Sequence, residues 1–173
     1  FSRQISAARR MVKELQEEEF DIIICLSHSG MDPDGNGGGK GEDVELARKV
    51  KGINIIISGH THTQLDKPLI VNGVPIVQTG DYGRNIGRIE LLLTDGSIKL
   101  EESHLISVDD QIPGNREINS IIEEQKKVIN KVILNPLGMD YGKIIAETDY
   151  LLECDEQGDV ENSNLGPFVA DAI

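Results

Sequence analysis

The sequence has 173 residues, of which 38% are hydrophobic and 27% are charged. A chain of this size and composition forms one globular domain, or one domain with part of another, rather than a disordered segment. Thirty acidic residues against 17 basic ones give a formal net charge of −13 at pH 7, which disfavours a nucleic-acid polymer or a membrane surface as a partner. No apolar run approaches the roughly 18 to 20 residues of a transmembrane helix, so no transmembrane segment is expected.

The first third of the sequence reads as a helix followed by a βαβ unit. Apolar residues recur every three or four positions over 2–19, which predicts an amphipathic helix. Residues 22–26 form a continuous apolar run, typical of a strand buried on both faces of a parallel sheet, and Cys25 within it is expected to be an inert core residue. The unit is completed by a glycine-rich loop (30–41), a short helix (42–51) and a second apolar strand (53–58).

The rest of the sequence predicts hairpins and helices. Favoured two-residue turns, Asn72-Gly73 and Asp95-Gly96, separate runs of apolar or alternating residues. The predicted elements are hairpins at 69–77 and 89–108, a helix over about 117–134, a strand-like run at 143–152 and a helix that starts at 164–167.

These elements predict an α/β (α+β) fold in three parts. Residues 1–108 form most of an α/β layer, residues 109–137 a linker helix, and residues 138–173 the start of a second α/β domain. The chain opens on Phe1, already inside the helical pattern, so we expect its natural N-terminus to lie upstream.

Three of the four histidines come after the two predicted buried strands. His28 comes after the first, and His60 and His62 come after the second. Because a right-handed crossover brings the carboxyl ends of consecutive parallel strands together, we expect the three imidazoles to share one crevice. An extended His-x-His segment projects both rings to one side, and imidazole suits zinc and transition metals. His104 lies outside these motifs and is expected to be structural or exposed.

The spacing of the histidines alone suggests a mononuclear zinc site completed by one water. A dinuclear site needs a bridging carboxylate and further ligands, and only Asp21 and the helix acids precede His28. The acids that come after His28 in the glycine-rich loop are interpreted as a solvated lid rather than as ligands. They are Asp32, Asp34, Glu42 and Asp43.

Two other kinds of site fit the sequence less well. The glycines at 35–41 suggest a phosphate-binding P-loop, but Asp34 and Gly41 stand where that motif needs Gly and Ser or Thr. Ser27 and Ser29 flank His28 without an evident third partner for a catalytic triad. Metal-assisted hydrolysis is therefore the better interpretation.

Two of these segments resemble the last two metal-binding motifs of the calcineurin-like metallophosphoesterases. They are Asp21-Ile-Ile-Ile-Cys-Leu-Ser-His28-Ser-Gly30 and Ile55-Ile-Ile-Ser-Gly-His60-Thr-His62-Thr63. Residues 75–91 resemble the segment next to these motifs in the two-domain 5'-nucleotidase and UDP-sugar hydrolase branch, and residues 162–172 resemble the opening of its C-terminal substrate domain. The resemblance implies that residues 1–108 are the C-terminal half of a metallophosphoesterase β-sandwich flanked by helices.

The resemblance also implies a chemistry, the hydrolysis of nucleoside monophosphates with two divalent metal ions such as Zn, Mn or Co. His28 and His60 would bind one ion and His62 the other. Arg84 and Asn85, flanked by glycines, are candidates for substrate contact. The family's other metal motifs, its bridging aspartate and its catalytic histidine lie upstream of these motifs, and its nucleobase-binding and phosphate-binding residues lie downstream. We therefore expect an internal fragment that is inactive alone and binds metal weakly.

Other functions stay open at this stage. Within the same superfamily the chain could belong to a cyclic-nucleotide phosphodiesterase, a UDP-sugar hydrolase or a sulfur-ester hydrolase. Outside enzymes, it could be a metal-binding or interaction module that lost its upstream half. Family members are mostly exported, so the resemblance implies a periplasmic, cell-surface or extracellular location.

Overall fold

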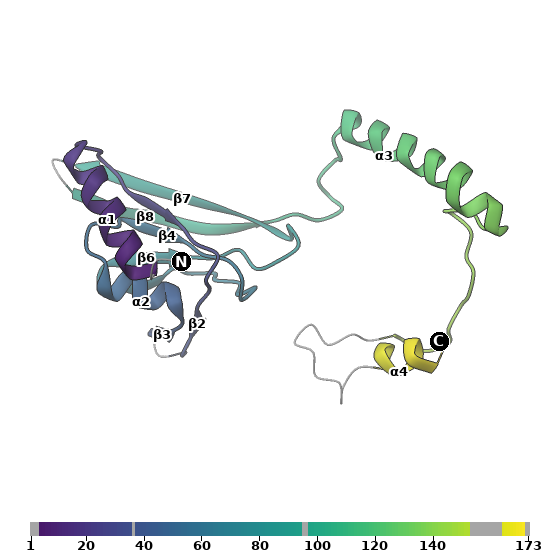
Figure 1. Cartoon of the computed structure of the whole chain (residues 1–173), viewed down its shortest axis with the longest axis horizontal. Coiled ribbons are helices and arrows are strands. Elements are labelled where there is room, and N and C mark those ends of the chain that lie inside the picture. The colour runs from purple at the N-terminus through teal and green to yellow at the C-terminus, as the bar shows by residue number, and fades with distance from the viewer. Residues whose placement is uncertain (1–3, 36, 95–96, 153–163, 172–173) are drawn as a thin grey trace. The chain divides into compact units, whose positions relative to one another are not determined.

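The computed structural model describes residues 4–35, 37–94, 97–152 and 164–171 (Figure 1). The chain divides into two compact units, Phe1–Pro113 and Gly114–Ile173. Helices combine with parallel and antiparallel strands, which confirms the predicted α/β class.

A four-stranded sheet with the strand order β1-β4-β6-β5 lies at the centre of the first unit. β1 (Ile24–Leu26) runs parallel to β4 (Ile55–Ile57), and β4 runs parallel to β6 (Val74–Val77). β5 (Leu69–Val71) pairs with β6 as the predicted antiparallel hairpin. Its Asn72-Gly73 turn has φ values of 50° and 80°, the positive pair that a type I′ turn requires. The predicted βαβ unit and first hairpin are confirmed.

Two helices pack against this sheet. α1 (Gln4–Glu17) and α2 (Glu42–Lys49) contact each other, and α2 also contacts β5 and β6. Burial of one aliphatic side chain is worth about 1.5 to 3 kcal/mol, so the apolar layer between the helices and the strands holds the strands in place. The buried side chains of this core include Val12, Val44, Leu46, Ala47, Ile56, Leu69, Val71 and Ile76.

β1 is less buried than its sequence predicts. The side chains of Ile24 and Leu26 are 48% and 77% exposed, whereas Ile23 is buried and Cys25 is half-buried. Because successive side chains of a strand point to opposite faces, the core covers one face of β1 and no described residue buries the other. The prediction of a strand was correct, and the prediction of burial on both faces was wrong for the described part of the chain.

The glycine-rich segment between β1 and α2 contains a small hairpin of its own. β2 (Asp32–Pro33) pairs antiparallel with β3 (Gly39–Lys40), and Gly39 is buried against the side chains of Leu69 and Val44. This segment is therefore partly regular structure rather than a plain loop.

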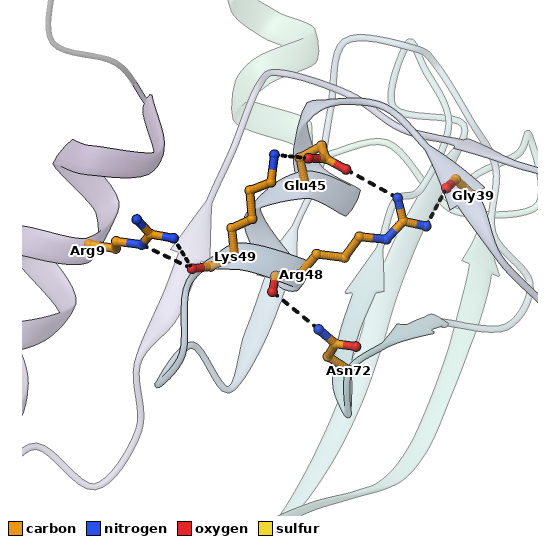
Figure 2. Close-up of polar contacts among 6 residues, drawn as sticks. All are labelled: Arg9, Gly39, Glu45, Arg48, Lys49 and Asn72. Carbon is orange, nitrogen blue, oxygen red and sulfur yellow. Dashed lines mark hydrogen bonds and ion pairs between the residues drawn. The ribbon is translucent and has the colours of Figure 1, made fainter.

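Hydrogen bonds fix α2 to its surroundings (Figure 2). Arg48 Nη2 donates to the carbonyl oxygen of Gly39 at 3.1 Å, and Asn72 Nδ2 donates to the carbonyl oxygen of Arg48 at 3.3 Å. Arg9 of α1 donates through Nε and Nη2 to the carbonyl oxygen of Lys49, at 3.1 and 2.9 Å. These hydrogen bonds connect α2 to β3, to the turn between β5 and β6, and to α1.

The predicted second hairpin is also present. β7 (Asn85–Thr94) and β8 (Ser97–Ser107) pair antiparallel, with a register shift between Glu90 and Leu91. His104 lies on β8, with its Nδ1 3.4 Å from Oε1 of Glu102.

The second unit begins with α3 (Arg116–Ile129), whose first N–H groups are capped by the side chain of Asn115. The helix continues as a π-helical turn (Asn130–Leu134) and a 3₁₀ turn (Asn135–Leu137). Gly138 ends it with a left-handed φ of 71°. The predicted helix over 117–134 is confirmed.

The end of the chain agrees with the sequence prediction only in part. α4 (Leu165–Asp171) begins where a helix was expected. Residues 143–152 form no strand, so that prediction was wrong. A strand-like run forms a strand only when it finds a pairing partner, and no described residue pairs with this one.

Candidate functional site

The structure brings His28 and His60 together at one edge of the sheet. Leu26 and Ile57, the last residues of β1 and β4, are register partners in the parallel pair, so the two loops after these strands leave the sheet side by side. The two imidazole rings meet edge to face, with centroids 5.5 Å apart and an interplanar angle of 62°. Neither residue is buried, so a ligand can reach the pair from solvent.

Gly59 makes room for this pair. A Cβ atom at position 59 would lie 3.0 Å from Nδ1 of His28, closer than nine in ten real Cβ contacts. Glycine therefore allows the β4 loop to approach this imidazole closely.

His62 does not join the pair. Its ring packs edge to face on Tyr82 with centroids 5.8 Å apart, and its Nδ1 lies 3.6 Å from Oδ2 of Asp81. The expected extended His-x-His segment was wrong, because His60 and His62 have left-handed φ values of 70° and 54°. Non-glycine residues adopt this region uncommonly and at a cost, often at functional sites.

A layer of buried polar groups supports the two histidine loops. Gln78 is 3% exposed, and its Nε2 donates to the hydroxyl oxygens of Ser58 and Thr61, both at 3.2 Å. Its Oε1 accepts the backbone N–H of Thr63 at 2.7 Å. These bonds fix the segment around His60, which has no regular secondary structure of its own.

Asp43 is the residue that sequence reasoning misplaced. It was interpreted as one of the solvated acids of the loop, but the structure buries it completely at the start of α2. Its carboxylate accepts hydrogen bonds from Ser27 and Ser58, which precede the two histidine motifs. Asp32 and Asp34 are exposed, as expected. Asp43 lies on the same helical face as the buried Leu46, Ala47 and Val50, and this spacing was the signal that could have revealed it.

Arg84 lies in the loop that carries Asp81, and Asn85 follows it as the first residue of β7. Arg84 Nε lies 3.7 Å from Oδ1 of Asp81, and the guanidinium stands 5.8 Å from the centroid of the Tyr82 ring. Asn85 Nδ2 donates to Oε1 of Gln64 and to the carbonyl oxygen of Thr79, both at 3.1 Å. Asn85 therefore fixes the start of β7, while Arg84 and Tyr82 remain exposed beside His62.

A cavity lies at the opposite end of the strands from the His28–His60 pair. It has a volume of about 600 Å³, and its lining includes Phe20 and Asp21 before β1 and Asn54 before β4. None of the described residues that line it is a histidine, so the His28–His60 pair and this cavity lie at opposite ends of the sheet.

The donor set suits part of a metal centre. Two adjacent imidazoles are ligands that zinc and similar divalent ions accept, and a side chain at position 59 would crowd Nδ1 of His28. Within residues 4–35, 37–94, 97–152 and 164–171, no group of three or more His, Cys, Asp or Glu side chains comes together to hold a metal ion. The His28–His60 pair therefore fits two ligands of a site and not a complete site.

The chain is similar in sequence to known phosphoesterases. The chain is 32% identical over its whole length to the trifunctional nucleotide phosphoesterase protein YfkN of Bacillus subtilis, of which it covers 11%. It is 26% identical to a snake venom 5'-nucleotidase of Crotalus adamanteus, again over the whole chain and covering 30% of that protein. No protein-family model matches the chain. The chain is a homologue of the calcineurin-like phosphoesterases and 5'-nucleotidases.

Solved structures agree with this relationship. The crystal structure of the calcineurin-like phosphoesterase YfkN superposes with a TM-score of 0.54 over 75% of this chain and 44% of the other, at 26% identity. The sulfate thiohydrolase SoxB of Thermus thermophilus superposes with a TM-score of 0.64 over 76% of this chain and 23% of the other, at 24% identity, a likeness of fold alone. This phosphoesterase homologue spans less than a third of the length of the curated relatives named above.

Proposed function

We propose that the chain forms part of a metal-dependent phosphoester hydrolase of the 5'-nucleotidase type, which releases phosphate from nucleoside monophosphates. The observation that carries this proposal is the His28–His60 pair at the carboxyl ends of adjacent parallel strands, in a homologue of a nucleotide phosphoesterase and of a 5'-nucleotidase. Ligands bind at this edge of open α/β sheets.

In this proposal His28 and His60 bind one divalent ion, and His62 binds a second. A divalent ion bound there would supply Lewis-acid chemistry, polarising a phosphoryl oxygen and lowering the pKa of a bound water. Asp81 Oδ2 lies 3.6 Å from Nδ1 of His62, so this carboxylate would face one nitrogen of the ring while the other nitrogen would hold the ion. The other metal ligands and the catalytic histidine come from parts of the protein outside this chain.

Arg84 is proposed to contact the phosphate group of the substrate. Its guanidinium contacts Asp81 and the face of the Tyr82 ring, both of which also contact His62. A planar guanidinium matches phosphate oxygens well. Asn85 serves this role indirectly, because its two hydrogen bonds fix the end of the loop that carries Arg84.

Domain organisation and location are proposed from the same resemblance. We propose that residues 1–108 are the C-terminal part of the metallophosphoesterase domain, residues 109–137 a linker helix, and residues 138–173 the start of the substrate domain. We also propose an exported protein, which fractionation of cells that express the whole reading frame tests directly. None of the described helices is long and apolar enough to cross a membrane.

Hydrolysis of AMP and p-nitrophenyl phosphate by the whole reading-frame product, beside the 173-residue chain, tests the function. The long protein should hydrolyse both esters in Mn²⁺ or Zn²⁺, and the 173-residue chain should not. His60→Ala should abolish hydrolysis, while His104→Ala, a histidine on the β7–β8 hairpin, should not. Full activity of the His60→Ala protein, or activity of the short chain equal to that of the long one, would contradict the proposal.

A further inference from the structure

Asp43 carries a buried carboxylate that no step described above uses. Its side chain is fully buried in the first turn of α2. Burying a carboxylate is costly unless hydrogen bonds compensate for the lost water. Three donors do so here. Ser27 Oγ donates to Oδ1 at 2.5 Å, Ser58 Oγ donates to Oδ2 at 2.6 Å, and the backbone N–H of Gly30 donates to Oδ2 at 3.1 Å.

These donors come from both histidine loops. Ser27 directly precedes His28, and Ser58 lies two residues before His60. Oδ1 accepts from the His28 loop through Ser27, and Oδ2 accepts from both loops, through Gly30 and Ser58. The carboxylate therefore joins the two loops. The backbone N–H of Asp43 also donates to the carbonyl oxygen of Gly30 at 3.2 Å. Asp43 and Gly30 are therefore joined by two hydrogen bonds, one donated by each residue.

The link continues from the carboxylate to the far end of the His60 loop. Ser58 Oγ, which donates to Asp43, also accepts from Nε2 of Gln78, and Gln78 in turn binds Thr61 and the N–H of Thr63. No buried side-chain nitrogen or oxygen of the described residues lacks a partner in this structure. A fully satisfied buried network fixes one geometry, which an apolar side chain at position 43 could not do.

We propose that Asp43 is a positioning residue that sets the distance and orientation of His28 and His60 through Ser27 and Ser58. The proposal rests on the metal-binding role given to that pair. Groups that orient metal-binding histidines from outside the ligand shell typically change metal affinity by about 10- to 100-fold when they are removed.

The first test needs no metal and uses NMR on the 173-residue chain. The nuclear Overhauser effect between ring protons of His28 and His60 reports on their contact. Asp43→Asn should weaken this effect at least about twofold and shift both sets of imidazole resonances. Val44→Ala is the matched control, because it alters a fully buried neighbour on α2 that does not bind the serines. Equal effects of the two variants would overturn the proposal.

Ser27→Ala and Ser58→Ala keep the test decisive if Asp43→Asn does not fold. Each variant removes one serine and leaves the carboxylate its other donors. Ser27→Ala should shift mainly the His28 resonances, and Ser58→Ala mainly those of His60. Unchanged resonances in both variants would show that the carboxylate does not position the rings.

Titration of the same chain with Co²⁺ separates this proposal from the proposed function. If His28→Ala and His60→Ala weaken Co²⁺ binding, and Asp43→Asn weakens it about tenfold or more while Val44→Ala does not, both stand. If Asp43→Asn binds Co²⁺ as Val44→Ala does, the positioning role is wrong and the metal role survives. If the histidine variants bind Co²⁺ as the parent chain does, the metal role fails, and the NMR comparison alone decides whether Asp43 positions the rings.

Discussion

The hydroxyl of Thr61, between His60 and His62, donates a 2.9 Å hydrogen bond to the carbonyl oxygen of Met31 in the segment after His28. The two histidine loops are therefore joined directly as well as through Asp43. Met31 is completely buried, so this bond attaches the left-handed His60–His62 segment to the core.

Removing the Thr61 hydroxyl should loosen that attachment. Thr61→Val keeps the shape of the side chain and should lower the free energy of unfolding by about 1 to 2 kcal/mol, because Gln78 also loses an acceptor. Urea denaturation measures the change. Thr94→Val, at the exposed end of β7, should change stability by less than about 0.5 kcal/mol. Equal losses in the two variants would argue against the attachment.

Gly30 should tolerate no side chain. Its φ is +93°, and a Cβ there would lie 2.6 Å from Cγ2 of Thr61. Gly30→Ala should cost about 1 to 2 kcal/mol for the left-handed backbone and about 1 to 3 kcal/mol more for overpacking. Gly73→Ala is the matched control, since Gly73 has a φ of +80° with open space around it and should show the backbone cost alone. Thermal unfolding of both variants measures the difference.

Cys25 should react slowly with alkylating reagents. Burial raises the pKa of its thiol above the ordinary value of 9.0, and the negative charge of Asp43 raises that pKa further. Only the thiolate reacts, so the rate of iodoacetamide modification should rise with pH to a midpoint above the ordinary value. The measurement needs a Cys154→Ser background, which leaves one thiol.

The effect of the Asp43 charge on the pKa of Cys25 can be tested on the same thiol. Replacing a negative charge by a neutral amide favours the thiolate, so Asp43→Asn should move the midpoint of modification to lower pH. A midpoint that does not move, or one that starts below the ordinary value of 9.0, would contradict the half-buried position of Cys25 near the charge of Asp43.

Arg9 should contribute to the docking of α1 onto α2. Its guanidinium donates twice to the carbonyl oxygen of Lys49 (Figure 2). Arg9→Ala should cost about 1 kcal/mol in the free energy of unfolding, and Arg9→Lys should recover only part of it, because an ammonium lacks the planar fork. Arg10→Ala, which removes a 3.9 Å ion pair with Glu14 within α1, should cost no more than about 0.5 kcal/mol.

Much of the fold could be predicted from periodicity and turn chemistry. Helical spacing predicted α1, α2 and α3, and Asn72-Gly73 predicted the β5–β6 hairpin. The rule that consecutive parallel strands end at the same edge also predicted the meeting of His28 and His60. These features depend on local sequence and on general topology, which a single sequence contains.

The position of His62 could not be predicted in the same way. Its direction depends on left-handed backbone at His60 and His62, and that backbone is held by hydrogen bonds from Thr61, Thr63 and Gln78. Gln78 reaches this segment because β6, which it follows, pairs with β4 in the sheet, so no local pattern reports this contact. The burial of Asp43 was missed because acidic residues in a glycine-rich segment are usually solvated.

The central claim is that His28 and His60 bind one and the same metal ion. Isothermal titration of the whole reading-frame product with Mn²⁺ or Zn²⁺, using His28→Ala, His60→Ala and the double variant, tests it most directly. If the two rings share an ion, each single variant should weaken the same binding event by about tenfold or more. The double variant should weaken that event by less than the product of the two single effects, because the effects of coupled residues are not additive.

His104→Ala is the control for the loss of a histidine elsewhere and should bind both ions as the parent protein does. Single-variant affinities equal to that of the parent protein would contradict the claim. Effects of His28→Ala and His60→Ala that fall on two different binding events would contradict it as well, because the adjacent imidazoles would then serve separate ions.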